Sequence, residues 1–381
     1  MTRQALGRRE FVGAGIAALS ALYAPRGFGS PADEGTPIPF LDAPAPNAER
    51  QLLQWDQLQS WVTPNADFFA VAHYDKPDVP AESWKLNVGG LVNNAKSFTL
   101  DALKARPKRE YVATLECSGN GASSSFIGGI GNARWTGTPL APLLKECGLK
   151  PEAIEAVFFA ADHGTEKIRG KDYPQNFARS LSITDALKDN VLLAYQMNGE
   201  PLPKDHGAPV RLVVPGWYGI AWVKWLTRIE LHDRRYMGRF MGRDYVTIRG
   251  EQQGEDVIWR ETAVGKMNLK SMVARVVRRG DGILTVTGAA WNDGSVPIRS
   301  VELKIDDGPW TAAKLGEGRD AAHCWKFWSY DWRDAAPGEH TLVSRVTDAA
   351  GKVQPAAEDA LIAMKKTYWE ANQQYPRKIK I

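Results

Sequence analysis

Apolar and polar residues alternate along several short segments in the last third of the chain, at 283–288, 301–305 and 340–346. A period of two places the apolar side chains of each segment on one face, as in a half-buried β-strand. Turn-forming Asp-Gly pairs such as Asp281-Gly282 separate these segments. The pattern predicts an antiparallel β-sandwich of immunoglobulin type over residues 262–365.

Two less regular segments flank this region. Residues 249–265 are expected to link the sandwich to the preceding domain. Residues 366–381 form a C-terminal tail, which we expect to pack back on the protein through Tyr368 and Trp369.

The preceding part of the chain mixes two periodicities. Residues 84–88 alternate and residues 191–195 form a continuous apolar run, both typical of strands, whereas 140–147 and 183–187 carry apolar residues at helical spacing. The predicted fold class is α+β: a mixed α/β domain at residues 61–250, followed by the all-β sandwich.

The N-terminus carries an arginine pair, Arg8-Arg9, followed by Phe11 and an apolar run from Val12 to Tyr23. The run is rich in Ala and Gly, has no polar face and is too short to span a bilayer. It predicts a twin-arginine export signal at residues 1–30 and a mature periplasmic protein without a membrane span. Because this route carries folded proteins, commonly with a cofactor, a cofactor site is expected.

A proline-rich segment follows the predicted signal. Pro37, Pro39, Pro44 and Pro46 favour extended backbone, so residues 31–60 are expected to form an extended arm.

Composition restricts the partners. The 381 residues are 44% hydrophobic and 24% charged, with a formal net charge of +4, which is ordinary for a globular protein. Four arginines and one glutamate in the first 30 residues account for most of this excess. The remainder has no basic surplus of the kind that follows a phosphate backbone, so nucleic acid is excluded as a partner.

The chain has three cysteines, too few for a disulfide framework and without the CxxC or CxxCH spacing of zinc ribbons and attached haem. Cys117 follows a β-like run and opens the Gly-rich segment Ser118-Gly119-Asn120-Gly121. A cysteine in such a place suits a thiolate ligand to a soft metal or a nucleophile. Alternatively, Cys117 is a small buried apolar residue with a purely structural role.

Three donor side chains follow within one short stretch. His206, Arg211 and Lys224 are interleaved with Pro, Gly and Trp, which is poor material for a solvated helix face. They could converge on a phosphate, with Arg binding two oxygens and Lys acting as a point charge.

Several motifs in order resemble the sulfite oxidase family of molybdenum-cofactor enzymes. The catalytic-domain motifs run from Pro64 to Tyr245, and sandwich motifs such as Gly308-Pro309-Trp310 resemble the family's dimerisation domain. The catalytic motifs are Phe68-Phe69 with His73, Glu116-Cys117-Ser118-Gly119-Asn120, Gly131-Asn132-Ala133-Arg134-Trp135, Met197-Asn198-Gly199, His206-Gly207-Ala208-Pro209-Val210-Arg211 and Lys224-Trp225-Leu226.

The resemblance implies a molybdopterin whose dithiolene, with the Cys117 thiolate, binds molybdenum, and a homodimer formed through the sandwich. Tyr245 matches the tyrosine that faces the metal and assists proton and electron movement. The remaining matched positions would bind the cofactor: Phe69 and His73 beside the pterin, Asp162 in contact with it, Val223 in the matched segment, and His206, Arg211 and Lys224 at its phosphate.

The chain departs from the sulfite-oxidising pattern at three positions. Where that pattern has arginines, this sequence has Val71, Ala122 and Ala221. An anionic substrate would lose three charge-assisted donors, each worth roughly 1.5–3 kcal/mol. Either other cations such as Lys171 or Arg134 supply the field, or the small-molecule substrate is neutral or larger than sulfite.

No haem motif is present, so electrons must pass to or from a separate carrier, such as a periplasmic cytochrome c. His163 follows Asp162 and lies either in the site or on a surface loop. Cys147 and Cys324 are expected to be packing residues.

Three alternatives to such an oxidase or dehydrogenase remain open at this point. A sulfoxide or other oxo-compound reductase would use the same molybdenum centre in reverse. A cofactor-free hydrolase would use Cys117 as nucleophile with His73 or His206 as base. A periplasmic binding protein would use the sandwich for recognition.

Overall fold

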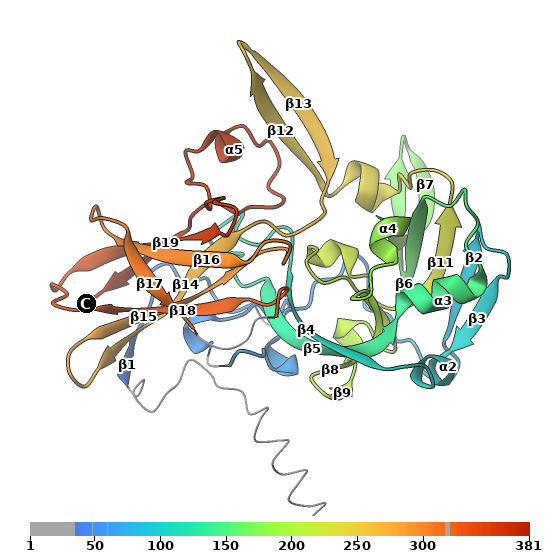
Figure 1. Cartoon of the computed structure of the whole chain (residues 1–381), viewed down its shortest axis with the longest axis horizontal. Helices are drawn as coiled ribbons and strands as arrows, with labels where there is room; N and C mark the ends of the chain where they lie inside the picture. Colours follow the sequence, from blue (N-terminus) through green and yellow to red (C-terminus); the bar gives the residue numbers. More distant parts are fainter. Residues whose placement is uncertain (1–34, 48, 59, 317–320) are drawn as a thin grey trace, which may run out of the picture.

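The computed structural model describes residues 35–47, 49–58, 60–316 and 321–381. The predicted export signal at 1–30 lies outside the described residues. Within them the chain forms two adjoining parts, an N-terminal domain and a C-terminal sandwich, with a β-hairpin projecting beside their junction (Figure 1).

The N-terminal domain is built on two five-stranded sheets. Its strands are β2 (Lys85–Gly90), β3 (Lys96–Thr99), β4 (Arg109–Glu116), β5 (Ile130–Pro139), β6 (Glu155–Ile168), β7 (Lys171–Ser182), β8 (Leu192–Met197), β9 (Glu200–Pro201), β10 (Arg211–Val213) and β11 (Leu226–His232). One sheet has the order β10-β8-β5-β4, with β9 paired to β8, and the other has the order β3-β2-β11-β6-β7. Strand β11 runs parallel to β2 and antiparallel to β6, so the second sheet is mixed.

In the described residues, three short α-helices lie around these sheets, α2 (Leu100–Lys104), α3 (Leu140–Cys147) and α4 (Ile183–Ala186). A fourth, α5 (Ala360–Ala363), lies in the C-terminal part beside β12 (Val246–Gln253) (Figure 1). Helix α3 ends at Gly148, whose φ of +71° suits a residue without a Cβ. The helices predicted at 140–147 and 183–187 are therefore present.

The C-terminal sandwich is an antiparallel path of eight strands in the order β1-β14-β15-β18-β17-β16-β19-β20. Across the fold Ser271 of β14 and Ser344 of β19 share a hydroxyl hydrogen bond of 2.9 Å. The strands are β1 (Gly35–Ile38), β14 (Lys270–Arg279), β15 (Leu284–Trp291), β16 (Ile298–Ile305), β17 (Thr311–Leu315), β18 (Lys326–Trp332), β19 (Glu339–Asp348) and β20 (Pro376–Lys380). The predicted α+β class with a terminal β-sandwich is confirmed.

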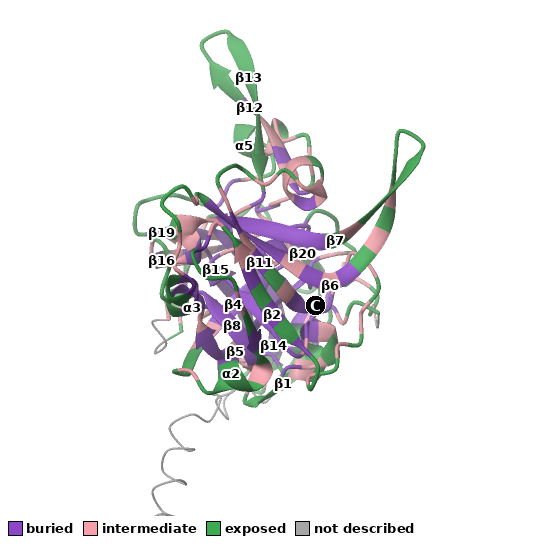
Figure 2. Cartoon of the chain, turned by 90° about the vertical axis from the view of Figure 1, so that its right-hand side faces the viewer, coloured by how far each residue is buried: buried purple, intermediate pink, exposed green. Residues whose placement is uncertain are grey.

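Three connecting segments are more ordered than the sequence indicates. The expected linker at 249–265 is mostly a projecting hairpin of β12 (Val246–Gln253) and β13 (Asp256–Ala263), exposed along most of its length (Figure 2). The two strands pair through backbone hydrogen bonds and bury few side chains, so they need few apolar residues. Their composition is therefore polar, like that of a linker. The expected arm contributes β1, which pairs with β14, and the tail contributes β20, which pairs with β19.

The two domains share a packed junction. Thr114 of β4 donates its backbone N–H to the carbonyl of His323 at 2.9 Å, and its hydroxyl accepts the N–H of Trp325 at 2.8 Å. Trp55 of the N-terminal segment stacks on Trp291 of the sandwich at 6.1 Å between ring centroids. Strand β4 therefore ends against the sandwich, where the loop that carries Cys117 begins.

Candidate functional site

A single cavity collects most of the predicted site residues. It encloses about 650 Å³ of empty space, its open mouth included, which is within the range of small-molecule sites. Its lining includes Phe69, His73, Cys117, Asp162, His206, Arg211, Lys224 and Tyr245.

Cys117 lies in the cavity wall at the end of β4, in a tight loop. Its N–H donates to the carbonyl of Gly129 at 2.7 Å, and its carbonyl accepts the N–H of Asn120 at 2.9 Å. A Cβ at Gly129 would stand 3.2 Å from the Cys117 Cβ, so the close approach of these chain segments favours glycine. Burial is the main cause that raises the pKa of the Cys117 thiol to about 11. That direction does not suit an activated hydrolytic nucleophile.

Tyr245 lies in the cavity wall after the π-helical segment η6 (Arg239–Arg243). Its backbone has a φ of +58°, in the left-handed region that non-glycine residues seldom adopt. The indole of Trp369 stacks on its ring at 4.1 Å between centroids. Burial raises the pKa of the Tyr245 phenol, which therefore remains protonated.

His73 and Tyr245 form a polar pair: the His73 Nε2 atom lies 2.7 Å from the Tyr245 hydroxyl oxygen. The imidazole packs against the rings of Phe177 and Phe240, each at 4.7 Å between centroids, and these two rings also contact each other. Burial, with the nearby Lys224, lowers the pKa of His73 to about 3. A neutral His73 can accept the tyrosine proton through Nε2, or donate from it in the other tautomer.

Arg211 and Lys224 bring positive charge to the cavity wall. Arg211 donates from Nη1 to the carbonyl of His206 at 3.1 Å and from Nη2 to the carbonyl of Trp222 at 3.0 Å, while its buried Nε has no partner. Lys224 donates to the carbonyl of Asp205 at 2.9 Å. Burial and the charge of Arg211 lower the pKa of Lys224 to about 7. Burial lowers that of His206 to about 4 and that of Arg211 to about 9.

This donor set fits a phosphate. A buried, unpartnered guanidinium N–H beside a lysine whose charge is disfavoured by its surroundings is a site that an anion would stabilise. A thiol and cationic side chains in one cavity fit a ligand that carries both a soft metal and a phosphate. Among the described residues no group of three His, Cys, Asp or Glu side chains is placed to hold a metal ion.

The remaining predicted cofactor residues differ in placement. Asp162 is buried in the cavity wall, and desolvation raises its pKa to about 6 against the opposing effect of Lys224. Phe69 lines the wall and stacks on Phe68 at 5.5 Å. Val223 is buried, and its carbonyl accepts the N–H of Leu212 at 2.8 Å, but its side chain is not part of the lining.

The three positions without arginine also differ. Val71 lines the cavity, Ala221 is buried beside the lining residue Ile220, and Ala122 is exposed. The two cations suggested as replacements for these arginines are wrong. Lys171 is exposed at the start of β7, and the Nε atom of Arg134 lies 3.4 Å from Oε1 of Glu110. Neither side chain is among the residues that line the cavity, which sequence order does not reveal.

Arg179 is a residue that the sequence reasoning missed. It is buried in β7 and donates from Nη2 to the carbonyl of Val264 at 2.5 Å and from Nη1 to the carbonyl of Phe240, while its Nε has no partner. Burial lowers its pKa to about 10, and the nearby Tyr245 opposes this shift. An arginine within the apolar run Phe177-Ala178-Arg179-Ser180-Leu181 was the available signal.

The other histidine and cysteine candidates lie outside the cavity lining. His163 is exposed, and its Nδ1 lies 3.3 Å from the carbonyl of Ala161. Cys147 is buried at the end of α3, and Cys324 is buried with its thiol 2.9 Å from the carbonyl of Val112. No helix in the described part of the chain is long and apolar enough to cross a membrane.

Comparisons with known proteins give two family matches. An oxidoreductase molybdopterin binding domain matches residues 73–240, and a Mo-co oxidoreductase dimerisation domain matches residues 261–373. The sulfite oxidase of Gallus gallus is 32% identical over 319 residues, which are 78% of this chain and 69% of that protein. The mitochondrial sulfite oxidase of Drosophila melanogaster is 31% identical over 78% of this chain, but the match spans only 56% of the fly protein.

A solved structure also matches. The sulfane dehydrogenase SoxCD from Paracoccus pantotrophus superimposes with a TM-score of 0.74 and 29% sequence identity. The match covers 86% of this chain and 84% of that chain.

Proposed function

The chain belongs to the sulfite oxidase family of molybdenum-cofactor oxidoreductases, as its motifs predicted, and from this premise we propose that it oxidises a reduced sulfur compound of low charge. Its cofactor is a molybdopterin that carries molybdenum. The observation that carries the proposal is the composition of one cavity, which is lined by a thiol, a tyrosine, two cationic side chains and Val71 in place of an arginine.

The residues divide the work of binding. Arg211, Lys224 and His206 would hold the cofactor phosphate, and Cys117 would bind the metal. When bound, the molybdenum supplies oxygen-atom transfer and accepts the two electrons. Binding of the phosphate by these charges would fix the position of the group, and Cys117 and Tyr245 would then lie beside its metal.

Tyr245 and His73 manage a proton at the metal end. The phenol keeps its proton because of burial, and it can donate a hydrogen bond to a substrate oxygen or to His73. The neutral imidazole fixes the orientation of the phenol, either by accepting its hydrogen bond through Nε2 or by donating one to its oxygen in the other tautomer. The surrounding rings of Phe177, Phe240 and Trp369 exclude water from this pair.

The substrate class follows from the charge near Cys117. Of the described residues that line the cavity, Arg211 alone is an arginine, and it lies with the phosphate cluster. Sulfite would therefore meet fewer donors than in a site with arginines at positions 71, 122 and 221. Sulfane sulfur is the first candidate, because the similar solved protein is a sulfane dehydrogenase.

The first experiment measures molybdenum by elemental mass spectrometry and pterin by fluorescence after denaturation. We expect about one molybdenum per chain in the wild type and a lower content in Cys117→Ser, where the dithiolene alone would hold the metal. Cys147→Ser is the matched control, because that thiol lies outside the cavity and should leave the metal content unchanged. A folded wild type without metal or pterin would overturn the proposal.

Substrate and direction are tested with the loaded enzyme. Steady-state rates with an oxidising dye are compared for sulfite and a small alkyl persulfide, and rates with a reducing dye for an alkyl sulfoxide. The proposal expects the persulfide to give the highest kcat/KM. A faster reaction with the reducing dye and sulfoxide would assign the chain to the reductase alternative.

We also propose that the protein is exported, dimerises and passes electrons to a separate carrier such as a periplasmic cytochrome c. The Arg8-Arg9 pair and the match to a dimerisation domain support the first two, and the lack of a haem motif supports the third. Replacing both arginines by lysine should block export of a reporter fusion. Light scattering should give twice the chain mass, and stopped-flow mixing should show the reduced enzyme reducing a periplasmic cytochrome c.

A further inference from the structure

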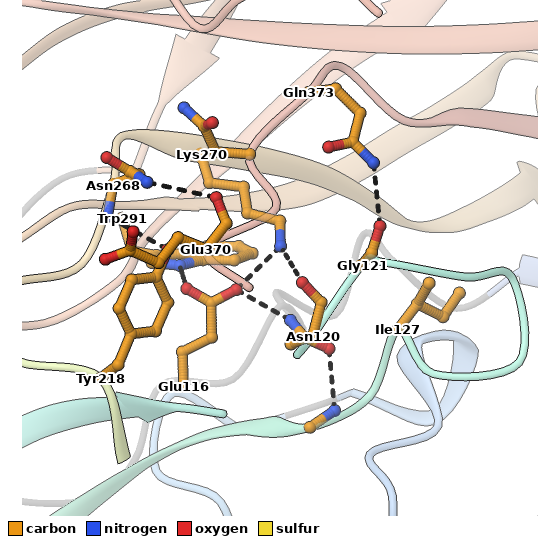
Figure 3. Close-up of polar contacts among 12 residues, drawn as sticks. Glu116, Asn120, Gly121, Ile127, Tyr218, Asn268, Lys270, Trp291, Glu370 and Gln373 are labelled. Carbon is orange, nitrogen blue, oxygen red and sulfur yellow. Dashed lines mark hydrogen bonds and ion pairs between the residues drawn. The ribbon is translucent and has the colours of Figure 1, made fainter. Parts of the chain in front are cut away.

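The loop that carries Cys117 is held by residues of the C-terminal sandwich. Glu116, the last residue of β4, is fully buried and directly precedes the cysteine. Lys270 donates to its Oε1 at 2.8 Å, and Trp291 donates from Nε1 to its Oε2 at 2.7 Å. Figure 3 shows both sandwich residues meeting the carboxylate from the side opposite to β4.

Lys270 and Trp291 are one cross-strand pair. They face each other in the register of β14 and β15, and the ammonium lies 5.8 Å from the indole ring centroid. This pairing sets two donors at the spacing of the two carboxylate oxygens. Neither donor is free to move away, because Lys270 is buried and Trp291 stacks on Trp55.

From Glu116 the network continues to the cysteine. Asn120 donates from Nδ2 to the Glu116 Oε1 at 2.9 Å, and its Oδ1 accepts the N–H of Gly129 at 3.0 Å. Gly129 in turn accepts the N–H of Cys117, and Asn120 donates its own N–H to the Cys117 carbonyl. The cysteine backbone therefore belongs to a closed set of hydrogen bonds that starts at Glu116.

The sandwich and its C-terminal tail also bind the backbone of the loop directly. Lys270 donates to the Asn120 carbonyl at 2.7 Å, Glu370 donates its N–H to the Ser118 carbonyl at 2.7 Å, and Gln373 donates to the Gly121 carbonyl at 2.9 Å. A Cβ at Gly121, whose φ is +84°, would stand 2.7 Å from the Lys270 Nζ. Glycine at this position lets the lysine reach the loop.

We propose that the Lys270–Trp291 pair, acting through Glu116, positions the Cys117 loop, so that the sandwich is part of the metal site as well as a dimerisation domain. A buried ion pair is seldom more stable than well-packed apolar residues of the same size. Its use beside the one thiol of the cavity indicates that it holds the loop in a single arrangement. The proposal rests on the proposed role of Cys117 as metal ligand.

The test is Lys270→Met, which removes the ammonium and keeps the length of the side chain. In the loaded full chain we expect the amides of Cys117 and Asn120 to exchange hydrogen at least tenfold faster, and the thiolate-to-molybdenum absorption band to shift. The matched control is Arg377→Met, which breaks the buried Arg377–Asp42 pair (2.9 Å) elsewhere in the sandwich. It should lower the unfolding temperature and leave both readouts at their wild-type values.

A second variant separates positioning from stability. Glu116→Gln combined with Lys270→Met removes both charges, so the unfolding temperature should recover, while amide exchange in the loop stays fast. Recovery of slow exchange together with stability would overturn the proposal. So would a Lys270→Met enzyme with the wild-type absorption band and exchange rates.

Two further measurements cover the cases in which Lys270→Met does not fold or the chain carries no cofactor. If Lys270→Met does not fold, Trp291→Phe removes only the N–H donor to Glu116 and should give the same changes at smaller size; unchanged readouts would overturn the proposal. Exchange is also measured in the cofactor-free chain. If the wild type contains no molybdenum, the proposed function is refuted. Fast exchange in cofactor-free Lys270→Met would still support the positioning of the Cys117 loop by Lys270.

Discussion

The Nε2 atom of His73 lies 2.7 Å from the hydroxyl oxygen of Tyr245, although 172 positions separate the two residues along the chain. Both groups are uncharged over the neutral range, because burial lowers the pKa of the histidine and raises that of the tyrosine. A neutral pair of this kind holds the phenol proton at a fixed place through one hydrogen bond, without a buried charge.

Tyr245→Phe removes the hydroxyl and keeps the ring against Trp369. We expect kcat to fall about a hundredfold, the size of a typical acid–base contribution, with the molybdenum content unchanged. His73 stays neutral above its pKa of about 3, so the wild-type rate should show no titration attributable to it between about pH 5 and 8. An active Tyr245→Phe enzyme with wild-type kcat would remove this tyrosine from the mechanism.

Trp369→Leu tests the support of Tyr245. The stack at 4.1 Å holds a residue whose backbone has a φ of +58°, a conformation that costs of order 1–3 kcal/mol outside glycine. Without it the tyrosine ring should move, and kcat should fall about tenfold, since small misplacements near the chemistry are costly. Trp259→Leu, on the exposed hairpin, is the matched control and should leave kcat unchanged.

Val71→Arg tests the substrate preference. It places a guanidinium in the cavity wall, where a charge-assisted hydrogen bond to an anion is worth roughly 1.5–3 kcal/mol. We expect the KM for sulfite to fall about tenfold or more, and the KM for an alkyl persulfide to change little. Ala122→Arg should have a smaller effect because position 122 is exposed. Equal effects of both variants would contradict the cavity assignment.

Anion binding by the cofactor-free chain should weaken as the pH rises through 7. Lys224 has a pKa of about 7, so its charge is lost above that pH, whereas the pKa of Arg211 is about 9 and that of His206 about 4. Asp162, with a pKa of about 6, becomes more negative across the same range and acts in the same direction. Sulfate is the probe because it remains a dianion throughout.

The measurement is the rise in unfolding temperature at fixed sulfate concentration between about pH 6 and 8.5. The wild type should lose most of this stabilisation across the range. Lys224→Met should show a small rise at every pH, and Lys224→Arg a rise that persists to the upper end, because arginine stays protonated. A pH-independent wild type would show that Lys224 does not bind the anion.

Local pattern was enough for much of the fold. Alternation at 340–346 predicted β19, whose buried positions alternate with partly exposed ones because one face packs on the core. Alternation at 283–288 predicted β15, which the structure contains although both of its faces are buried. Helix α3 was predicted equally well from its apolar spacing, and it ends at a glycine. The hairpin of β12 and β13 was not, since its strands stabilise each other through backbone pairing and carry little apolar periodicity.

Residue types and motifs were enough to indicate the chemistry of the cavity: a cysteine in a glycine-rich loop, a group of cations and the family to which these motifs belong. Which side chains share a wall became visible only in the folded chain, where Val71 lines the cavity and Ala122 is exposed. The tertiary structure alone brought Lys270 to Glu116 across 154 positions and buried Arg179 beside Tyr245. Motifs reflect local backbone and residue type, whereas the partner of a buried charge is set by packing between elements far apart in the chain.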